Sequence, residues 1–460
     1  MARQPHVLFV ICDQMQNQRM GVVDPVAFTP ALDRLAREGV RFSHLYCSNP
    51  QCVPSRVSLQ TGLYPHEAGV MIIYGFHGHT AHLSGEERTV GQELRDAGYT
   101  TAYFGKTHFG IGLGKLGYDH GGNEHVAGGN PAKDRAYTDQ ALAFLEGHDV
   151  RQPLFLTVSL HSPHPAFERV DAFAEHYPLE RMRLPESYYK DDLSGKPPFQ
   201  RQHAVDGHHG TGAEAALRDE LFRYYTMISH VDHLFGELRA AFEAKGMWED
   251  TVVLFTADHG DMMGAHRTRL KGTLPYEELY RVPCLMRLPG GSHAGRVVDS
   301  LAVNTALPGT LMAAAGLPVP AAFRGGSLLP LLERPASAPP PAEEEIFFEH
   351  YGAYWGLHPL RGIRSRRHGP DGVQEWKYVR YYGPDDTEEM YDLAADPHEL
   401  VNLAADGRRA VAAVRADLSA RVERWWAATG GRSFADYEAP AFKARGAATL
   451  EQPPRRRSAD

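Results

Sequence analysis

Short apolar runs and longer periodic segments alternate through the first two-thirds of the chain. The short runs are rich in β-branched residues and predict strands at 6–12, 100–104, 154–160, 251–257 and 282–288. The longer segments repeat apolar residues every three or four positions and predict helices at 29–39, 89–98 and 213–245. Because strands that alternate with helices favour a parallel sheet covered on both faces, we expect an α/β fold with a large mixed, mostly parallel sheet sandwiched by helices.

A change of composition divides the chain near its last quarter. Residues 335–345 (PASAPPPAEEE) have no apolar period and predict a linker. Beyond them, four short apolar runs are spaced like an antiparallel sheet, and a periodic segment over 408–428 predicts a helix. We therefore expect a large domain over 1–334, a smaller C-terminal domain over 346–430 with an antiparallel sheet and a helix, and a polar tail over 431–460.

Composition narrows the functional classes. Of 460 residues, 48 are Lys or Arg and 57 are Asp or Glu, so the formal charge is −9 and no basic excess favours a nucleic-acid partner. The longest early apolar run, residues 7–12, is too short for a membrane span or a secretion signal, so we expect a cytoplasmic protein without membrane association. Four cysteines are too few for a disulfide framework, and we interpret three as buried and structural: Cys12, Cys47 and Cys284.

Two acidic residues directly follow predicted strands. Asp13, next to Gln14, follows the first strand, and Asp258, next to His259, follows the fourth. Ligand sites in parallel sheets lie beyond the carboxyl ends of the strands, where a poorly solvated carboxylate favours a cation. If the two positions converge, they offer oxygen and nitrogen ligands to a divalent metal. The alternative is that each aspartate caps the turn or helix that follows it.

Residues 49–56 place a cysteine beside a predicted helix start. Pro54 suits the first turn of a helix, so Cys52 would lie just before the helix N-terminus and Arg56 in the first turn. The positive end of the helix and the guanidinium attract anions and would lower the pKa of the thiol, which makes it reactive. The alternative is a small buried cysteine before a turn.

The Cys-x-Pro-x-Arg pattern at 52–56, followed by Thr61-Gly62, resembles the signature of the type I sulfatases in the alkaline-phosphatase superfamily. In that family, a maturation enzyme that reads these residues oxidises the cysteine to Cα-formylglycine. Other family segments recur in order: Gly105-Lys106-Thr107-His108, Pro163-His164-Pro165, Thr256 to Asp261, Lys271-Gly272, Tyr391-Asp392-Leu393 and Asn402-Leu403. The resemblance spans about residues 5–405, with gaps at about 110–150 and 165–215.

The resemblance implies a sulfate-ester hydrolase with a formylglycine nucleophile and a divalent metal. The implied metal ligands are Asp13, Gln14, Cys52 in its oxidised form, Asp258 and His259. The aldehyde would hydrate to a gem-diol, of which one oxygen attacks sulfur and the other lets sulfate leave. The other implied catalytic residues are Arg56 to orient the diol, Lys106 and Lys271 to neutralise sulfate, His164 to protonate the leaving alcohol, and His108 to accept the diol proton.

Gln14 and His259 depart from the common family pattern, which has a second aspartate and often an asparagine at these positions. In this respect the chain is similar to the choline sulfatases and to the phosphonate monoester and phosphodiester hydrolases. The phosphonate hydrolases typically replace the family lysine and histidine by tyrosine and threonine, so Lys106 and His108 favour a sulfate monoester of a sugar, aryl or alkyl alcohol. We expect calcium as the metal, with manganese or magnesium as alternatives.

The resemblance also implies partners: a small-molecule or saccharide sulfate ester and the maturation enzyme, with oligomerisation left open. Two other functions stay open, a phosphonate monoester or phosphodiester hydrolase on the same scaffold and a non-catalytic binder of sulfated ligands with unmodified Cys52. We interpret the loop histidines as solvated, with a substrate pocket as the alternative: His77, His79, His82, His203, His208 and His209. We interpret Tyr351, Tyr354 and Trp355 as core residues, with a wall for a substrate ring as the alternative.

Overall fold

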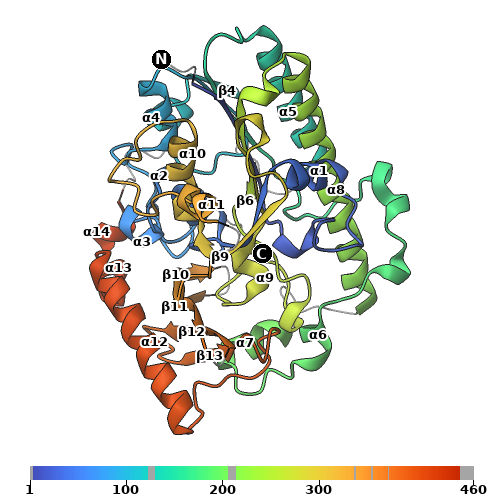
Figure 1. Ribbon diagram of the computed structural model, residues 1–460. Helices are drawn as coiled ribbons and strands as arrows, with labels where there is room; N and C mark the ends of the chain where they lie inside the picture. The colour runs from blue at the N-terminus through green and yellow to red at the C-terminus, as the bar shows by residue number, and fades with distance from the viewer. Residues whose placement is uncertain are drawn as a thin grey trace.

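The computed structural model describes residues 4–122, 130–205, 214–335, 338–353, 356–370 and 372–445. One large sheet has the strand order β4-β3-β5-β1-β6-β8-β2-β7, with β9 paired to β2 (Figure 1). Its strands are β1 His6–Cys12, β2 Val40–Tyr46, β3 Thr100–Gly105, β4 His120–Gly122, β5 Leu154–Ser159, β6 Thr251–Ala257, β7 Arg281–Val282, β8 Cys284–Arg287 and β9 Arg296–Val303. β4, β3, β5, β1 and β6 are mutually parallel, whereas β7 and β8 run antiparallel to their neighbours. The expected mixed, mostly parallel sheet is confirmed.

Helices cover both faces of this sheet. On one face, α1 (Pro30–Glu38) and α5 (Pro131–Gly147) pack against α8 (Glu214–Ala244), and on the other α10 (Leu307–Ala314) packs against α2 (Cys52–Thr61) and α4 (Val90–Asp96) (Figure 1). The shorter helices are α3 Pro65–Ala68, α6 Glu186–Lys190, α7 Pro198–Val205, α9 Glu277–Tyr280, α11 Leu329–Glu333, α13 Phe434–Glu438 and α14 Pro440–Lys443. Among the described residues, none of the helices combines the length and apolar character needed to cross a membrane.

The predicted strands are present, with one division and three omissions. The run at 282–288 forms β7 and β8 rather than one strand, because Pro283 lies between them and has no N–H for the ladder. Sequence reasoning missed the three-residue β4 and also β2 and β9, which pair parallel to each other. Both β2 and β9 carry polar residues between their apolar positions, so neither shows a continuous apolar run.

The second sheet has four antiparallel strands, β10 Glu343–Ala353, β11 Gly356–Gly369, β12 Gly372–Tyr381 and β13 Glu388–Asp392. One face adds Phe348, Leu360 and Tyr381 to the main apolar core. The other face packs on α12 (Arg409–Ala428), which is the predicted helix. β10 begins inside the predicted linker, and α13 and α14 lie in the predicted tail, of which residues 446–460 fall outside the described residues. The division of the chain into domains stays a prediction.

The carboxyl ends of four neighbouring strands line up at one edge of the large sheet. The register pairs Ser159 of β5 with Gly105 of β3 and with Ile11 of β1, and it pairs Cys12 of β1 with Ala257 of β6. The loops that follow these strands therefore start side by side. Gly105 has φ +111°, and a Cβ there would lie 1.9 Å from the Ser159 carbonyl oxygen, so only glycine allows this close approach.

A buried ammonium group joins the second sheet to the large domain. Lys377 of β12 lies 2.8 Å from a carboxylate oxygen of Glu277 in α9 and 2.7 Å from one of Glu399, and it donates to the Pro275 carbonyl. Burial would lower the pKa of Lys377, but the two carboxylates outweigh it and raise that pKa. Removal of the cation would leave the buried Glu399 carboxylate close to the half-buried Glu277 carboxylate without the ammonium group between them.

We predict that Lys377→Ala lowers the free energy of unfolding by about 3–5 kcal/mol, because it leaves the buried Glu399 carboxylate without its ammonium partner. Urea denaturation followed by tryptophan fluorescence measures this change. Arg367→Ala is the matched control: its ion pairs with Glu343 and Asp417 are exposed, so it should cost less than about 1 kcal/mol. Equal effects of the two substitutions would contradict the structural role given to Lys377.

Candidate active site

Helix α2 begins at Cys52, so Cys52 is the first residue of the helix, whereas the sequence predicts it just before the helix start, and the whole helix is buried. Gln51 is the N-cap in an extended conformation, and Gly62 ends the helix in the left-handed conformation. The first amides of a helix have no intrahelical acceptor, so they face the loop edge of the sheet with a partial positive charge. The Cys52 side chain thus lies at a helix end that attracts anions.

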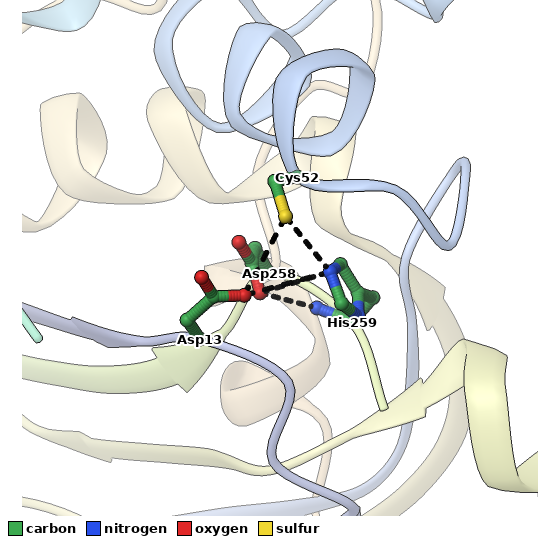
Figure 2. A group of neighbouring side chains, drawn as sticks. All are labelled: Asp13, Cys52, Asp258 and His259. Atoms are coloured by element: carbon green, nitrogen blue, oxygen red, sulfur yellow. Dashed lines mark hydrogen bonds and ion pairs between the residues drawn. The ribbon is translucent and has the colours of Figure 1, made fainter. Parts of the chain in front are cut away.

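Asp13, Asp258 and His259 meet the Cys52 thiol directly beyond β1 and β6 (Figure 2). The sulfur lies 3.7 Å from Asp13 Oδ1 and 3.3 Å from His259 Nε2, and that nitrogen is 3.5 Å from Asp13 Oδ1. One ligand atom from each of the four residues falls within 4.8 Å of the others, and all four residues are buried. The two strand ends therefore converge, as expected for a metal site, rather than capping separate turns.

The orientation of two neighbouring side chains fits a cation at this point. His259 Nδ1 lies 2.8 Å from the Gly260 carbonyl oxygen and must carry the proton, so Nε2 presents a lone pair to the site. The Gln14 amide nitrogen donates to Asp261, which turns Oε1 toward the site, where it accepts from Lys271 at 2.9 Å. Two carboxylates, one amide oxygen and one imidazole nitrogen are a donor set suited to calcium, manganese or magnesium.

Two lysines reach the same sulfur from different loops. Lys106, directly after β3, lies 3.5 Å from Cys52 Sγ and pairs with Asp13. Lys271 lies 2.8 Å from Cys52 Sγ and 3.1 Å from His259 Nε2. Both lysines are buried, so their charges act in a medium of low dielectric constant. The thiol therefore lies in an anion-binding environment built from two ammonium groups and a helix start.

His108 and His164 also face the thiol. A hydrogen bond with His108 contributes to the low pKa of Cys52. Burial and Lys271 lower the pKa of His164, whereas a hydrogen bond with Cys52 acts to raise it. His164 Nδ1 contacts the Pro165 carbonyl, so its Nε2 is the nitrogen available for a reacting group. Asp134 of α5, which sequence reasoning missed, holds this loop by accepting the backbone N–H groups of His161 at 2.6 Å and Ser162 at 2.8 Å.

Arg56 contacts Asp258 instead of the thiol. Its Nε donates to Asp258 Oδ2 at 2.8 Å, and its Nη1 donates to Ser159 Oγ and to the Lys106 carbonyl. The guanidinium is fully buried, so it holds Asp258 and ties the loops after β3, β5 and β6 together. The predicted role of Arg56 in orienting the diol on residue 52 stays a prediction.

The charges of the site are strongly coupled. Burial would raise the pKa of Cys52, but Lys106, Lys271 and His259 outweigh it and hold that pKa well below its usual range. Burial and the neighbouring Asp13 raise the pKa of Asp258, despite its contacts with His259 and Arg56. Two carboxylates this close in a dry site need positive charge beside them, which the lysines, Arg56 and a divalent ion can supply.

All the predicted site residues lie at this edge of the sheet, but the loop histidines differ from expectation. His79 and His82 are buried rather than solvated, as is His203, whereas His77 is exposed as predicted. His79 lies 3.4 Å from Glu438 of α13, which belongs to the segment predicted as a polar tail. Tyr351 is a core residue as predicted, and Cys12, Cys47 and Cys284 are buried and free. The predictions for Tyr354, Trp355, His208 and His209 fall outside the described residues.

The family follows from a comparison over most of the chain. Residues 5–317 match the family model for sulfatases, and residues 265–427 match the model described as N-sulphoglucosamine sulphohydrolase, C-terminal. The chain belongs to the sulfatase family, within the alkaline-phosphatase superfamily. Like its family, it is a sulfuric ester hydrolase. The resemblance to sulfatases that the sequence analysis drew from residues 52–56 is therefore confirmed.

Relatives of this sulfatase cover nearly its whole length. It is 25% identical to an N-acetylglucosamine-6-O-sulfatase of Bacteroides thetaiotaomicron, over 87% of this chain and 83% of the relative. A protein solved in complex with its substrate D-glucosamine-2-N,6-O-disulfate has a TM-score of 0.77 at 22% identity, over 93% of this chain and 98% of that one. The phosphonate monoester hydrolase of Agrobacterium radiobacter has a TM-score of 0.72 at 22% identity, over 94% and 97%. These two structures share the fold.

We predict that Asp261→Asn weakens divalent-metal affinity by roughly 10–100-fold. The new amide can still accept the N–H groups of Met263 and Leu270, but its own NH₂ would face that of Gln14 and turn the Gln14 oxygen away from the site. Calcium and manganese titrations by calorimetry measure the affinity. Asp192→Asn, an exposed carboxylate, is the control, and an unchanged affinity in Asp261→Asn would refute this role.

Proposed function

We propose that this sulfatase hydrolyses a sulfate monoester of a sugar to the free alcohol and inorganic sulfate, with formylglycine at residue 52 and a divalent metal. The observation that carries the proposal is the pair of buried ammonium groups, Lys106 and Lys271, which approach one side chain at 3.5 and 2.8 Å. Such a pair is suited to the oxygens of a tetrahedral anion. The sugar-sulfate specificity named for the N-acetylglucosamine-6-O-sulfatase supports the choice of alcohol.

The metal and the oxidised cysteine supply what the unmodified side chains lack. A divalent ion held by Asp13, Gln14, Asp258 and His259 would withdraw charge from the ester, and calcium is the ion we propose. A hydrated aldehyde at residue 52 supplies one hydroxyl to attack and a second to release sulfate, whereas a cysteine or serine would remain as a stable adduct. The maturation enzyme is then a required partner.

The chain's own residues bind the ester and move protons. Lys106 and Lys271 hold the sulfate oxygens and balance the charge that develops during transfer. His164 presents Nε2 to the leaving oxygen and donates a proton there, with Lys271 close to the same point. His108 accepts the proton released at residue 52 when sulfate departs. Arg56 holds Asp258 in place through its Nε, so that this metal ligand does not rotate away.

A second candidate is a phosphonate monoester or phosphodiester hydrolase on the same scaffold. Gln14 and His259 favour it, because they occupy the positions at which those enzymes differ from most sulfatases, and the phosphonate monoester hydrolase shares the fold. Lys106 and His108 favour the sulfate reaction, and both contribute to the low pKa of Cys52. The sulfate assignment therefore has the better support.

We predict that the protein, co-produced with a formylglycine-generating enzyme and loaded with calcium or manganese, hydrolyses 4-nitrophenyl sulfate faster than an aryl phosphonate monoester or an aryl phosphodiester. Lys106→Ala should lower kcat/KM for the sulfate by roughly 10²–10³-fold, because one donor to the sulfate oxygens is lost. Release of 4-nitrophenolate measures all three reactions. Sulfate turnover below both phosphorus substrates would favour the second candidate.

Variants of residue 52 separate these enzymes from a non-catalytic binder. Cys52→Ala should keep its thermal midpoint and lose turnover, whereas Cys284→Ala, which removes another buried thiol, should keep turnover. Peptide mass spectrometry of the co-produced wild type should show the aldehyde at residue 52. Unmodified cysteine, together with binding of sulfated ligands and no turnover, would identify a binder instead.

A further inference from the structure

The C-terminal sheet presents one polar side chain to the large domain without a partner. Both ring nitrogens of His350 in β10 lack a hydrogen-bond partner among the described residues, although the side chain is fully buried. A buried donor or acceptor without a partner costs about 1–3 kcal/mol, so native proteins rarely keep one unless a ligand or water completes it. The ring is therefore a candidate for contact with a bound molecule.

The register of the sheet places His350 on the face that covers the active-site loops. His350 pairs with Leu360, and Leu360 pairs with Tyr381, so the three side chains form a row on one face. Tyr381 donates its hydroxyl to the Thr273 carbonyl at 3.4 Å, two residues after Lys271. Phe347, on the opposite face, stacks on Trp425 of α12. His350 thus faces the domain that holds the thiol.

The edge of β10 also joins the segment that leads to Cys52. The backbone N–H of Glu349 donates to the Ser48 carbonyl at 2.8 Å, four residues before the thiol. The strand that carries His350 and its neighbours in the sheet therefore contact two stretches of chain, 48–52 and 271–273, which come together where Lys271 meets Cys52 Sγ.

The 48–52 segment carries two more buried polar atoms that lack a hydrogen-bond partner among the described residues. They are Asn49 Oδ1 and Gln51 Oε1. Burial and the nearby His358 lower the pKa of His350 to about 3, so its ring is neutral and offers one donor and one acceptor. Amide oxygens accept only, so the three groups suit a ligand with several hydroxyl donors and no charge of its own.

We propose that His350, Asn49 and Gln51 form a subsite for the hydroxyl groups of the alcohol half of the substrate, and that this half is a sugar ring. The proposal rests on the sulfatase function proposed above and adds the feature that distinguishes a sugar sulfate from an aryl sulfate. A second sulfate group would face two unpaired acceptor oxygens here and is disfavoured. An aryl ring would leave the same three polar groups unsatisfied.

Substitution of His350 tests the subsite in the matured, metal-loaded enzyme. We expect the wild type to prefer N-acetylglucosamine 6-sulfate or glucose 6-sulfate to 4-nitrophenyl sulfate. His350→Phe should raise KM for the preferred sugar sulfate by roughly ten-fold, the loss of about one to two hydrogen bonds, and change kcat/KM for 4-nitrophenyl sulfate less than about two-fold. His350→Gln, which keeps a donor and an acceptor, should restore most of the sugar KM.

A thermal midpoint separates this role from a structural one. His350→Phe should keep or raise the midpoint, because the ring has no protein partner to lose. The matched control is His66→Phe, which removes a buried histidine that bonds Glu349 and Thr429 and should lower the midpoint by several degrees.

Three results would overturn the subsite: a wild type that prefers the aryl sulfate to both sugar sulfates, equal losses on both substrate types in His350→Phe, or an unfolded His350→Phe. A wild type that turns over neither 4-nitrophenyl sulfate nor either of the two sugar sulfates would instead refute the sulfatase function itself. The two failures are therefore distinguishable.

Discussion

Two carboxylates forced together by the sheet are the constraint on which the site depends. β1 and β6 are parallel neighbours in full register, so Asp13 and Asp258 leave the sheet side by side and are both buried. Their repulsion in a medium of low dielectric constant must be balanced. Arg56 behind Asp258 and Lys106 beside Asp13 balance part of this charge, and the unprotonated nitrogen of His259 adds a neutral ligand, so that together they define a place for a divalent cation.

The same constraint explains why the anion-binding groups come from distant parts of the sequence. Lys106 follows β3, His164 follows β5, Lys271 follows the loop after β6, and Cys52 opens α2, which lies over this edge of the sheet. Each strand end delivers one group, and the buried guanidinium of Arg56 ties three of the loops together. The C-terminal sheet then closes one side of the site through contacts with the loops at 48 and 273. A rigid sheet edge thus positions groups that loops alone would hold loosely.

The sequence predicted the strand ends and the helix start because apolar runs, a proline at a helix start and the residues beside them are local features. It therefore predicted which loops carry Asp13, Cys52 and Asp258. It could not predict side-chain partners that depend on tertiary packing: that Arg56 turns to Asp258, that Asp261 orients Gln14, or that Asp134 supports the His164 loop. The solvated interpretation of His79 was wrong because α13 and α14 cover its loop, with Glu438 near the ring and the Lys443 carbonyl accepting from Thr80.

The most direct test of this account is the position of the metal in crystals of the matured protein grown with manganese. Anomalous diffraction at the manganese edge should show one strong peak within bonding distance of Asp13, Asp258, His259 Nε2 and Gln14 Oε1. Such a peak would establish that the paired carboxylates and the orientation of Gln14 exist to hold a cation beside residue 52. A manganese-saturated crystal with no peak between the two aspartates, or with its ion bound elsewhere, would contradict it.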